Sequence, residues 1–309
     1  MPFAEHLAAG LNTSIAVGFR VTEAKSESPR GQDEGAIWDL PRTVYLYRDP
    51  SSVTLRLEEV SSYLETVLGL RCEIRDEFFV HHGKEHVEGL AKRIAATRVR
   101  DILRPFQARE PMFGEVQFEL RLLRDPEKRV PAILYDAFEY LALLRSLLPR
   151  EEATLKTLHV AFVHRLLGTF GQDGRYHART VVCSYPSLVS TSGLVEAPAK
   201  PEGYYKLKAK LSLALGTVPF EAAKEPFEGQ FLDYDDDRMT EVAKGYALLA
   251  AMYHIAKESF CDEPSCRLFD AHTQSELLAA QVASGKLCRP HGALAERIRR
   301  SMSGDGRQV

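Results

Sequence analysis

The feature that most constrains this chain is the spacing of cysteine and histidine near its carboxyl end. Cys261 and Cys266 form one short-spaced pair, and a longer segment separates them from a second pair, Cys288 and His291. Two such pairs suit a tetrahedral Zn²⁺ ion, because each pair comes from one tight turn. Three thiolates and one imidazole fill all four positions, so we predict a structural zinc site. The alternative is a chance cluster of small buried cysteines.

A long apolar segment leads directly into these cysteines. Thr240 can cap a helix that begins at Glu241 and ends near Phe260. Apolar residues on most of its sides predict a helix at the centre of the fold. On such a helix His254 and Glu258 share a face, one turn apart. His254 could therefore bind a metal or a substrate, or it could be a hydrogen-bonded residue of the core.

The segment between the two cysteine pairs, residues 267–281, is predicted to be a second helix. His272 and Glu276 are four residues apart and would share a face. We expect the zinc site to fold this helix against the first, so that His272 and Glu276 meet His254 and Glu258 in a cleft. The histidines could then bind a second, catalytic ion, with Glu258 or Glu276 as a ligand or general base. The alternative is a surface helix with an i,i+4 pair.

The rest of the chain predicts an α/β fold. Strand patterns at 43–47 and 72–80 alternate with helical patterns at 55–68, where Gly69 suits the C-cap, and 86–102. This alternation predicts a mostly parallel, mixed sheet with crossover helices. The further elements that we expect are a strand at 116–123, a helix at 132–148, a central strand at 158–164, a strand at 180–190 interrupted at Pro186, and loops at 190–205 and 216–229.

We divide the chain into three parts on these patterns. Residues 1–40 are weakly patterned and are expected to be a flexible N-terminal segment. Residues 41–239 carry the α/β domain. Residues 240–309 carry the buried helix and a helical subdomain that the Cys3His zinc site holds together.

Composition excludes some classes of function. The formal net charge is −3, so no global basic field favours nucleic acid or an anionic membrane. No apolar run is long enough for a transmembrane helix, and the first residues lack a basic secretory n-region. We therefore expect a cytoplasmic protein that binds neither membranes nor nucleic acid. Its five cysteines are then ligands or buried thiols. The oligomeric state cannot be predicted.

Two other histidine groups attract attention. His164 and His177 flank a turn-like stretch, and His81, His82 and His86 follow a predicted strand. We expect His164 and His177 to be turn or surface residues, although His177 could line a cleft. We expect the other three in a solvated loop rather than a metal site, because no nearby cysteine or ordered carboxylate spacing accompanies them.

The apolar segment followed by Cys-x4-Cys and a distal pair resembles the archaemetzincins. That resemblance implies a metzincin-like sheet, an active-site helix and zinc-dependent peptide hydrolysis. The archaemetzincin helix carries HExxHxxGxxH immediately before the first cysteine. On this chain the pattern places its first His at Ala250, its Glu at Ala251, its second His at His254, its Gly at Lys257 and its third His at Phe260. Only His254 is retained, while His291 stands in place of a final cysteine.

A second resemblance rests on longer segments. Residues 190–205 (STSGLVEAPAKPEGYY) and 266–278 (CRLFDAHTQSELL) are similar to an archaeal and bacterial group described as metallopeptidases. Together the resemblances cover residues 40–295. They imply either a metal-dependent peptidase with a non-standard active site, or an inactive descendant that binds a peptide or protein partner. In zincins the glutamate of this motif is the catalytic base, and in this chain Ala251 occupies its position.

Overall fold

The main sheet of the protein is mixed and mostly parallel. The computed structural model describes residues 40–83, 87–129, 133–215 and 220–303. The strands of this sheet are, in spatial order, β2 (Cys72–Arg75), β1 (Thr43–Tyr47), β4 (Thr157–Val163), β8 (Ser187–Ser190) and β7 (Val181–Val182). Only the β7–β8 pair is antiparallel. The predicted α/β class is therefore confirmed, as is the central strand, since all residues of β4 are buried.

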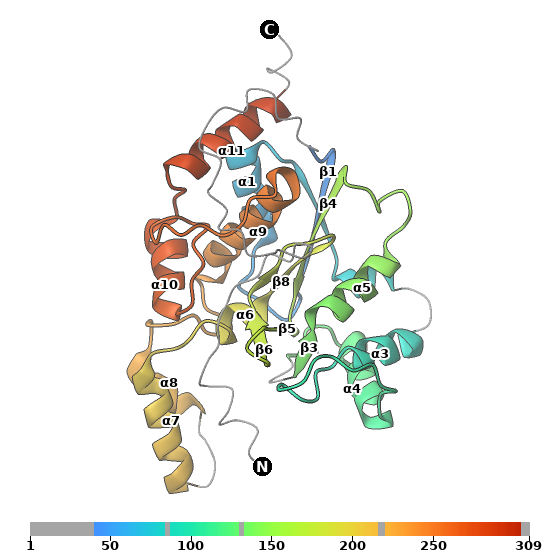
Figure 1. Cartoon of the computed structure of the whole chain (residues 1–309), viewed down its shortest axis with the longest axis vertical. Coiled ribbons are helices and arrows are strands. Elements are labelled where there is room, and N and C mark those ends of the chain that lie inside the picture. The colour runs from blue at the N-terminus through green and yellow to red at the C-terminus, as the bar shows by residue number, and fades with distance from the viewer. Residues whose placement is uncertain (1–39, 84–86, 130–132, 216–219, 304–309) are drawn as a thin grey trace.

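A second, smaller sheet lies at one end of the first (Figure 1). It contains β3 (Leu134–Asp136), β5 (Leu166–Phe170) and β6 (Tyr176–Arg179), with β3 parallel to β5 and β6 antiparallel to it. β5 follows β4 almost directly, so the chain turns from the central strand of the main sheet into this second sheet.

Helices cover both faces of the main sheet (Figure 1). α1 (Leu57–Leu68) and α9 (Met239–Ala256) pack on one face and share its largest apolar core, and α11 (Arg289–Met302) packs against α1. α5 (Ala137–Leu147) closes a second core on the opposite face. The remaining helical elements are α2 (Phe78–His82), α3 (Val87–Ala96), α4 (Phe113–Arg124), α6 (Thr191–Glu196), α7 (Glu202–Leu215), α8 (Phe220–Lys224), η1 (Glu225–Phe227), α10 (Gln274–Leu278) and the π-helical η2 (Ala279–Ser284).

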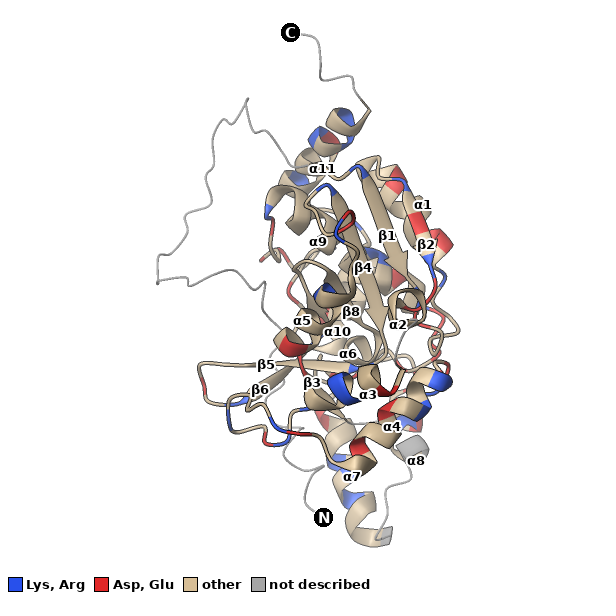
Figure 2. Cartoon of the chain, turned by 90° about the vertical axis from the view of Figure 1, so that its right-hand side faces the viewer, with Lys and Arg blue, Asp and Glu red and all other residues tan. Residues whose placement is uncertain are grey.

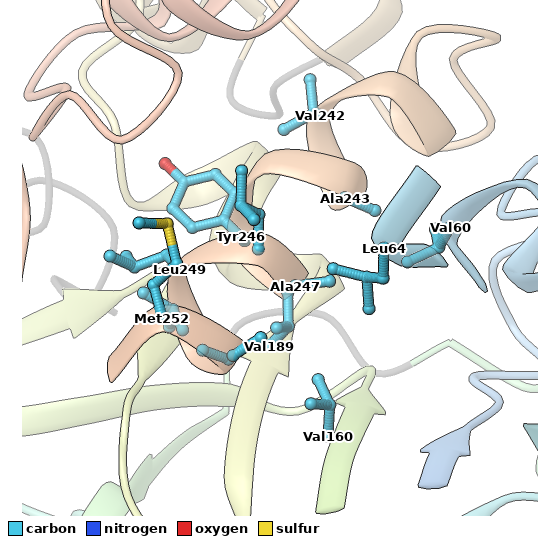
Figure 3. Close-up of a cluster of buried hydrophobic side chains, with 14 of the residues drawn as sticks. Val60, Leu64, Val160, Val189, Val242, Ala243, Tyr246, Ala247, Leu249 and Met252 are labelled. Carbon is cyan, nitrogen blue, oxygen red and sulfur yellow. The ribbon is translucent and has the colours of Figure 1, made fainter. Parts of the chain in front are cut away.

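α9 is the central helix of the fold, as its composition predicts. Fourteen of its 18 residues are buried, so it is enclosed on nearly every side. Figure 3 shows Ala247 of α9 between Leu64 of α1 and Val189 of β8. Small side chains such as Ala243 and Ala247 let the neighbouring elements approach the α9 backbone closely.

Both predicted ends of this helix are wrong. α9 begins at Met239 rather than after Thr240, and the Thr240 hydroxyl instead donates to the Thr54 carbonyl oxygen and accepts from the Arg56 amide. The helix ends at Ala256, because Lys257 adopts a left-handed conformation with φ 57°. Thr240 thus fastens α9 to the start of α1, whose own C-cap at Gly69 is confirmed.

Four element predictions fail because a polar side chain has a structural role. The stretch predicted as one strand at 72–80 becomes β2 and α2, since Glu77 accepts hydrogen bonds from two amides and starts the helix. The expected strand at 116–123 is α4, whose Glu119 is fully buried and ion-paired with Arg98 and Arg165. Asp136 caps α5, so the expected helix at 132–148 begins as β3. Ser190 caps α6, so helices α6 and α7 occupy the expected loop at 190–205.

Other predictions are partly correct. The strand pattern at 180–190 forms β7 and β8, which are separated by a turn with a cis Tyr185–Pro186 bond. The helix at 86–102 is shorter, since α3 ends at Ala96, and the loop at 216–229 contains α8 and η1. The N-terminal prediction for residues 1–39 and the placement of His86 lie outside the described residues.

The largest apolar core contains residues from both the predicted α/β domain, 41–239, and the predicted C-terminal part, 240–309. One apolar cluster includes Val44 of β1, Val160 of β4, Met252 of α9 and Ile298 of α11. The C-terminal region is helical, as predicted, and packs on the same face of the sheet as α1 (Figure 1). Across the described ranges, no helix combines the length and apolar character that crossing a membrane requires.

A substitution at Gly245 can measure how tightly α9 is packed. A Cβ atom at this position would lie 1.8 Å from the side-chain oxygen of Gln281 and 3.0 Å from Cγ of Arg267. We expect Gly245→Ala to lower the free energy of unfolding by about 1–3 kcal/mol, because an overpacked core must shift. Urea unfolding measures the change.

Gly114 supplies the matched control, since it is also helical and no atom lies within 4 Å of an added Cβ. Gly114→Ala should leave stability unchanged or raise it slightly. Equal unfolding midpoints for both variants would show that α9 tolerates the extra methyl group.

Candidate metal centre

The structure brings Cys261, Cys266, Cys288 and His291 together. One ligand atom from each residue lies within 4.8 Å of the others. The Cys261 and Cys288 sulfurs are 3.9 Å apart, and the Cys266 sulfur is 3.6 Å from Nδ1 of His291. Nδ1 of His291 therefore faces the three sulfurs.

These distances can be compared with a tetrahedral site. Zinc–sulfur and zinc–nitrogen bonds of ordinary length place two sulfurs about 3.8 Å apart and a sulfur about 3.6 Å from a nitrogen. The two distances above agree with this geometry. Cys288 Sγ lies closer to Nδ1 of His291, at 3.0 Å. The residues present therefore fit a metal ion that prefers sulfur and imidazole ligands.

Backbone amides point at the sulfurs. The Glu263 amide donates to Sγ of Cys261 at 3.3 Å, and the amides of Leu268 and Cys288 donate to Sγ of Cys266 at 3.5 and 3.4 Å. Such donors stabilise the negative charge of a thiolate, which is the form that binds metal.

The ionisation of the cluster suits metal binding. Burial raises the pKa of Cys266, but the His291 ring and the two backbone amides lower it more, to about 7. Hydrogen bonds with Cys266 and Glu258 raise the pKa of His291 to about 10. Binding a metal at this cluster would therefore displace protons from thiols and imidazole.

Short backbone contacts hold the segments of this site in place. Isolated β-bridges join Cys261 to Phe269 and Cys266 to Lys286. Pro290, the second residue of α11, starts the helix whose first turn carries His291. The local chain is therefore extended around the cysteines, and the predicted helix at 267–281 is wrong in its first half, since α10 begins at Gln274.

Arg267 anchors this loop region to α9. Its side chain is 2% exposed and donates to the carbonyl oxygens of Glu241 and Gln281 at 3.0 Å each. It also pairs with the Glu241 carboxylate, and its guanidinium lies over the Tyr63 ring. The cluster is thus fixed to the central helix by contacts that need no metal.

Glu258 lies next to the cluster rather than on α9. Its predicted position one turn beyond His254 is wrong, because the helix ends at Ala256. The Glu258 carboxylate lies 3.3 Å from Nε2 of His291, the ring nitrogen that faces away from the sulfurs. A carboxylate on the second nitrogen fixes the orientation of a metal-binding imidazole. Sequence spacing gave no signal for this contact between Glu258 and His291.

The other predicted catalytic residues are not brought into one cleft. His254 is 4% exposed and its Nε2–H donates to the Leu155 carbonyl oxygen at 2.8 Å. Glu276 completes a capping box at the start of α10, where it accepts from the amides of His272 and Thr273. His272 precedes that helix, so the expected i,i+4 pair on a helical face is wrong.

Cys261, Cys266, Cys288 and His291 form the only group of three or more possible metal ligands within 4.8 Å in the part of the chain that the structure describes. His164 and His177, which we expected at the surface, are buried, with 9% and 6% exposure. The expected exposure is wrong for both, because His177 forms part of buried β6 and His164 directly follows buried β4, although His164 does lie in the short bend before β5.

Comparison with known proteins decides the family. A family model described as "Probable metallopeptidase family (DUF6775)" matches residues 40–298, which is more than four fifths of the chain. This protein belongs to that family. No curated protein and no solved structure matches the chain. The family description and the Cys3His cluster, which is able to bind a metal ion, are two independent observations that agree.

Removing one sulfur should remove the metal from this metallopeptidase-family protein. We expect Cys266→Ser to lose about one equivalent of bound metal and to unfold at a lower temperature, because metal binding contributes to folding. Elemental analysis and thermal unfolding measure the two effects. Cys72→Ser is the matched control, since Cys72 lies on β2 outside the cluster. Equal metal content in both variants would contradict the site.

Glu258→Gln tests the contact with His291. We expect metal affinity to fall by about 10–100-fold, as when other carboxylate partners of metal-binding histidines are lost. Competition with a chromophoric chelator measures the affinity. Glu263→Gln is the control, because that carboxylate contacts Ser265 and not a ligand. Unchanged affinity in Glu258→Gln would show that the contact has no effect on the metal.

Proposed function

We propose that this protein is an archaemetzincin-like member of its family with a structural zinc ion and a degenerate active site. The Cys3His donor set supports zinc, because soft sulfur ligands with one imidazole are typical of structural zinc sites. Zinc in such a site supplies folding free energy and a cross-link between chain segments, and four protein ligands leave no position for a water.

One observation carries the degenerate active site. At the positions where archaemetzincins have the first histidine and the glutamate, Ala250 and Ala251 are fully buried in the core. His254 retains the place of the second histidine, but its Nε2–H is engaged with the Leu155 carbonyl oxygen. Lys257 ends the helix, so Phe260 lies beyond it. A zinc ion on this face would have one imidazole and no neighbouring glutamate base.

The function that this arrangement supports best is binding of a peptide or protein partner without hydrolysis. Family membership supports peptides as the ligand class. We propose a cytoplasmic location, which five free thiols support. Figure 2 shows both acidic and basic side chains on the face that it presents, which agrees with a partner that is neither a nucleic acid nor a membrane.

A second candidate function is metal-dependent peptide hydrolysis, favoured by the family description. His254 and His272 would then bind a second ion, and Glu258 or Glu276 would serve as a ligand or general base. This candidate requires those residues to leave their present hydrogen-bond partners.

Peptide turnover and metal content together test the proposal. We expect about one zinc per chain, no change in zinc content in His254→Ala, and no cleavage of a fluorogenic peptide mixture with added Zn²⁺, Mn²⁺ or Co²⁺. Binding of the same peptides is measured by equilibrium dialysis. Cleavage that His254→Ala abolishes, while His81→Ala retains it, would establish the hydrolase instead.

A further inference from the structure

The carboxyl ends of the central parallel strands form a polar site away from the metal cluster. β1, β4 and β8 run in the same direction, and Asp49, His164 and Thr191 follow their last residues closely. The chain order changes direction between β1 and β4, because β2 lies beside β1 and β8 lies on the other side of β4. Such a switch point at the carboxyl edge is where open α/β sheets bind ligands.

A small cavity lies at this edge. Its volume is about 30 Å³, and its polar lining includes Asp49, Glu77, His164 and Arg165. A second depression shares His164 with Ser52 and Tyr234. The first cavity has room for one group of about the size of a water molecule or an ammonium.

His164 presents an acceptor nitrogen that the fold leaves unused. The Ser192 hydroxyl donates to the backbone carbonyl of His164, so its oxygen can accept from Nδ1–H of the same residue at 3.3 Å. Burial lowers the pKa of His164, which favours the neutral ring with a lone pair on Nε2. Among the residues that the structure describes, Nε2 is buried and has no hydrogen-bond partner.

The charges around His164 favour a cationic ligand. Asp49 is 6% exposed, and its carboxylate accepts from the neutral donors of Ser51 and Thr191. No lysine or arginine nitrogen within the described ranges pairs with it. The nearby cations are already paired, since Arg165 contacts Glu119 and Arg129 contacts Asp235. A buried carboxylate without a cation is costly, so a positive group at this site is stabilised.

Glu77 and Lys128 complete the charged lining. Glu77 accepts from the amides of Phe79 and Val80 and forms no ion pair among the described residues. Lys128 lines the same cavity but is exposed. The lining thus sets two carboxylates, Asp49 and Glu77, against the buried Arg165, which Glu119 already pairs, and Lys128 is exposed to solvent.

We propose that this site binds the primary ammonium group of a peptide, with Nε2 of His164 and the Asp49 carboxylate as acceptors. The inference rests on the proposed peptide binding and adds the group that is recognised. The ammonium could be a peptide's amino terminus or a lysine side chain. An ammonium has three donors, and two protein acceptors plus solvent satisfy them. A tightly held metal ion needs more closely grouped ligands, which this site lacks among the described residues.

Three tripeptides distinguish the sources of the ammonium group. Calorimetric titration compares Ala-Ala-Ala, its N-acetylated form, and N-acetyl-Ala-Lys-Ala amide. We expect acetylation of Ala-Ala-Ala to weaken binding at least tenfold. Tight binding of only the free terminus identifies the amino terminus, and binding of the acetylated lysine peptide identifies the side chain. Either result supports the site.

Variants place the binding at His164 and Asp49. His164→Leu and Asp49→Asn should each weaken binding by tenfold or more, whereas His164→Gln, which keeps an acceptor near Nε2, should retain more affinity than His164→Leu. Glu65→Gln, a change of the same charge on the surface of α1, should bind normally. Thermal unfolding confirms that each variant is folded.

Three results would overturn the proposal. Equal binding of acetylated and free Ala-Ala-Ala would show that the ammonium group is not recognised, although the protein binds peptides. Normal peptide affinity in folded His164→Leu would show that the peptide binds elsewhere on the protein. The third result is that peptide binding requires a second metal ion per chain, which His164→Leu loses. That result would show that a metal ion, and not an ammonium group, occupies the site. Absence of binding by any peptide would count against the proposed function itself.

Discussion

The burial of α9 is the constraint on which the rest of the structure depends. This helix touches β4, β7 and β8 on one side and α1 on another, so its surface is filled by apolar contacts. Such close packing explains its alanines and Gly245, and it leaves no room for a zinc-activated water beside Ala250 and Ala251. The same burial places the start of the cysteine loop next to the core. The helix ends before Lys257, and the cysteine loop begins there.

The two polar sites of the molecule differ in how their residues are positioned. The Cys3His cluster is formed by loop segments and the first turn of α11, tied to α9 through Arg267. The His164 site is formed by the ends of rigid central strands. Under our two proposals, a zinc ion at the cysteines would support the fold, while a different set of side chains at the strand ends would recognise the ligand.

Sequence reasoning predicted the parts of this structure that depend on periodic apolar patterns or fixed ligand spacing. It found β1, β4, α1, the central helix and the four clustered side chains, because each pattern is local. It failed where a single polar residue acts through contacts distant in the chain. Glu119 in the core of α4 made a helix resemble a strand, and Lys257 ended α9 before Glu258. The buried acceptor of His164 depends on Ser192 of α6, and no spacing rule indicates that pairing.

The contacts of Arg267 have a consequence for how quickly the cluster can capture its ion. Arg267 is held by α9 and by the Gln281 carbonyl, and its own amide donates to Lys286. The loop on either side of Cys266 is therefore preorganised by protein contacts alone. Little conformational entropy remains to be lost when an ion arrives, so capture should be fast and the affinity high for so short a ligand loop. The apoprotein would keep its sheet intact and bind the ion without refolding this loop.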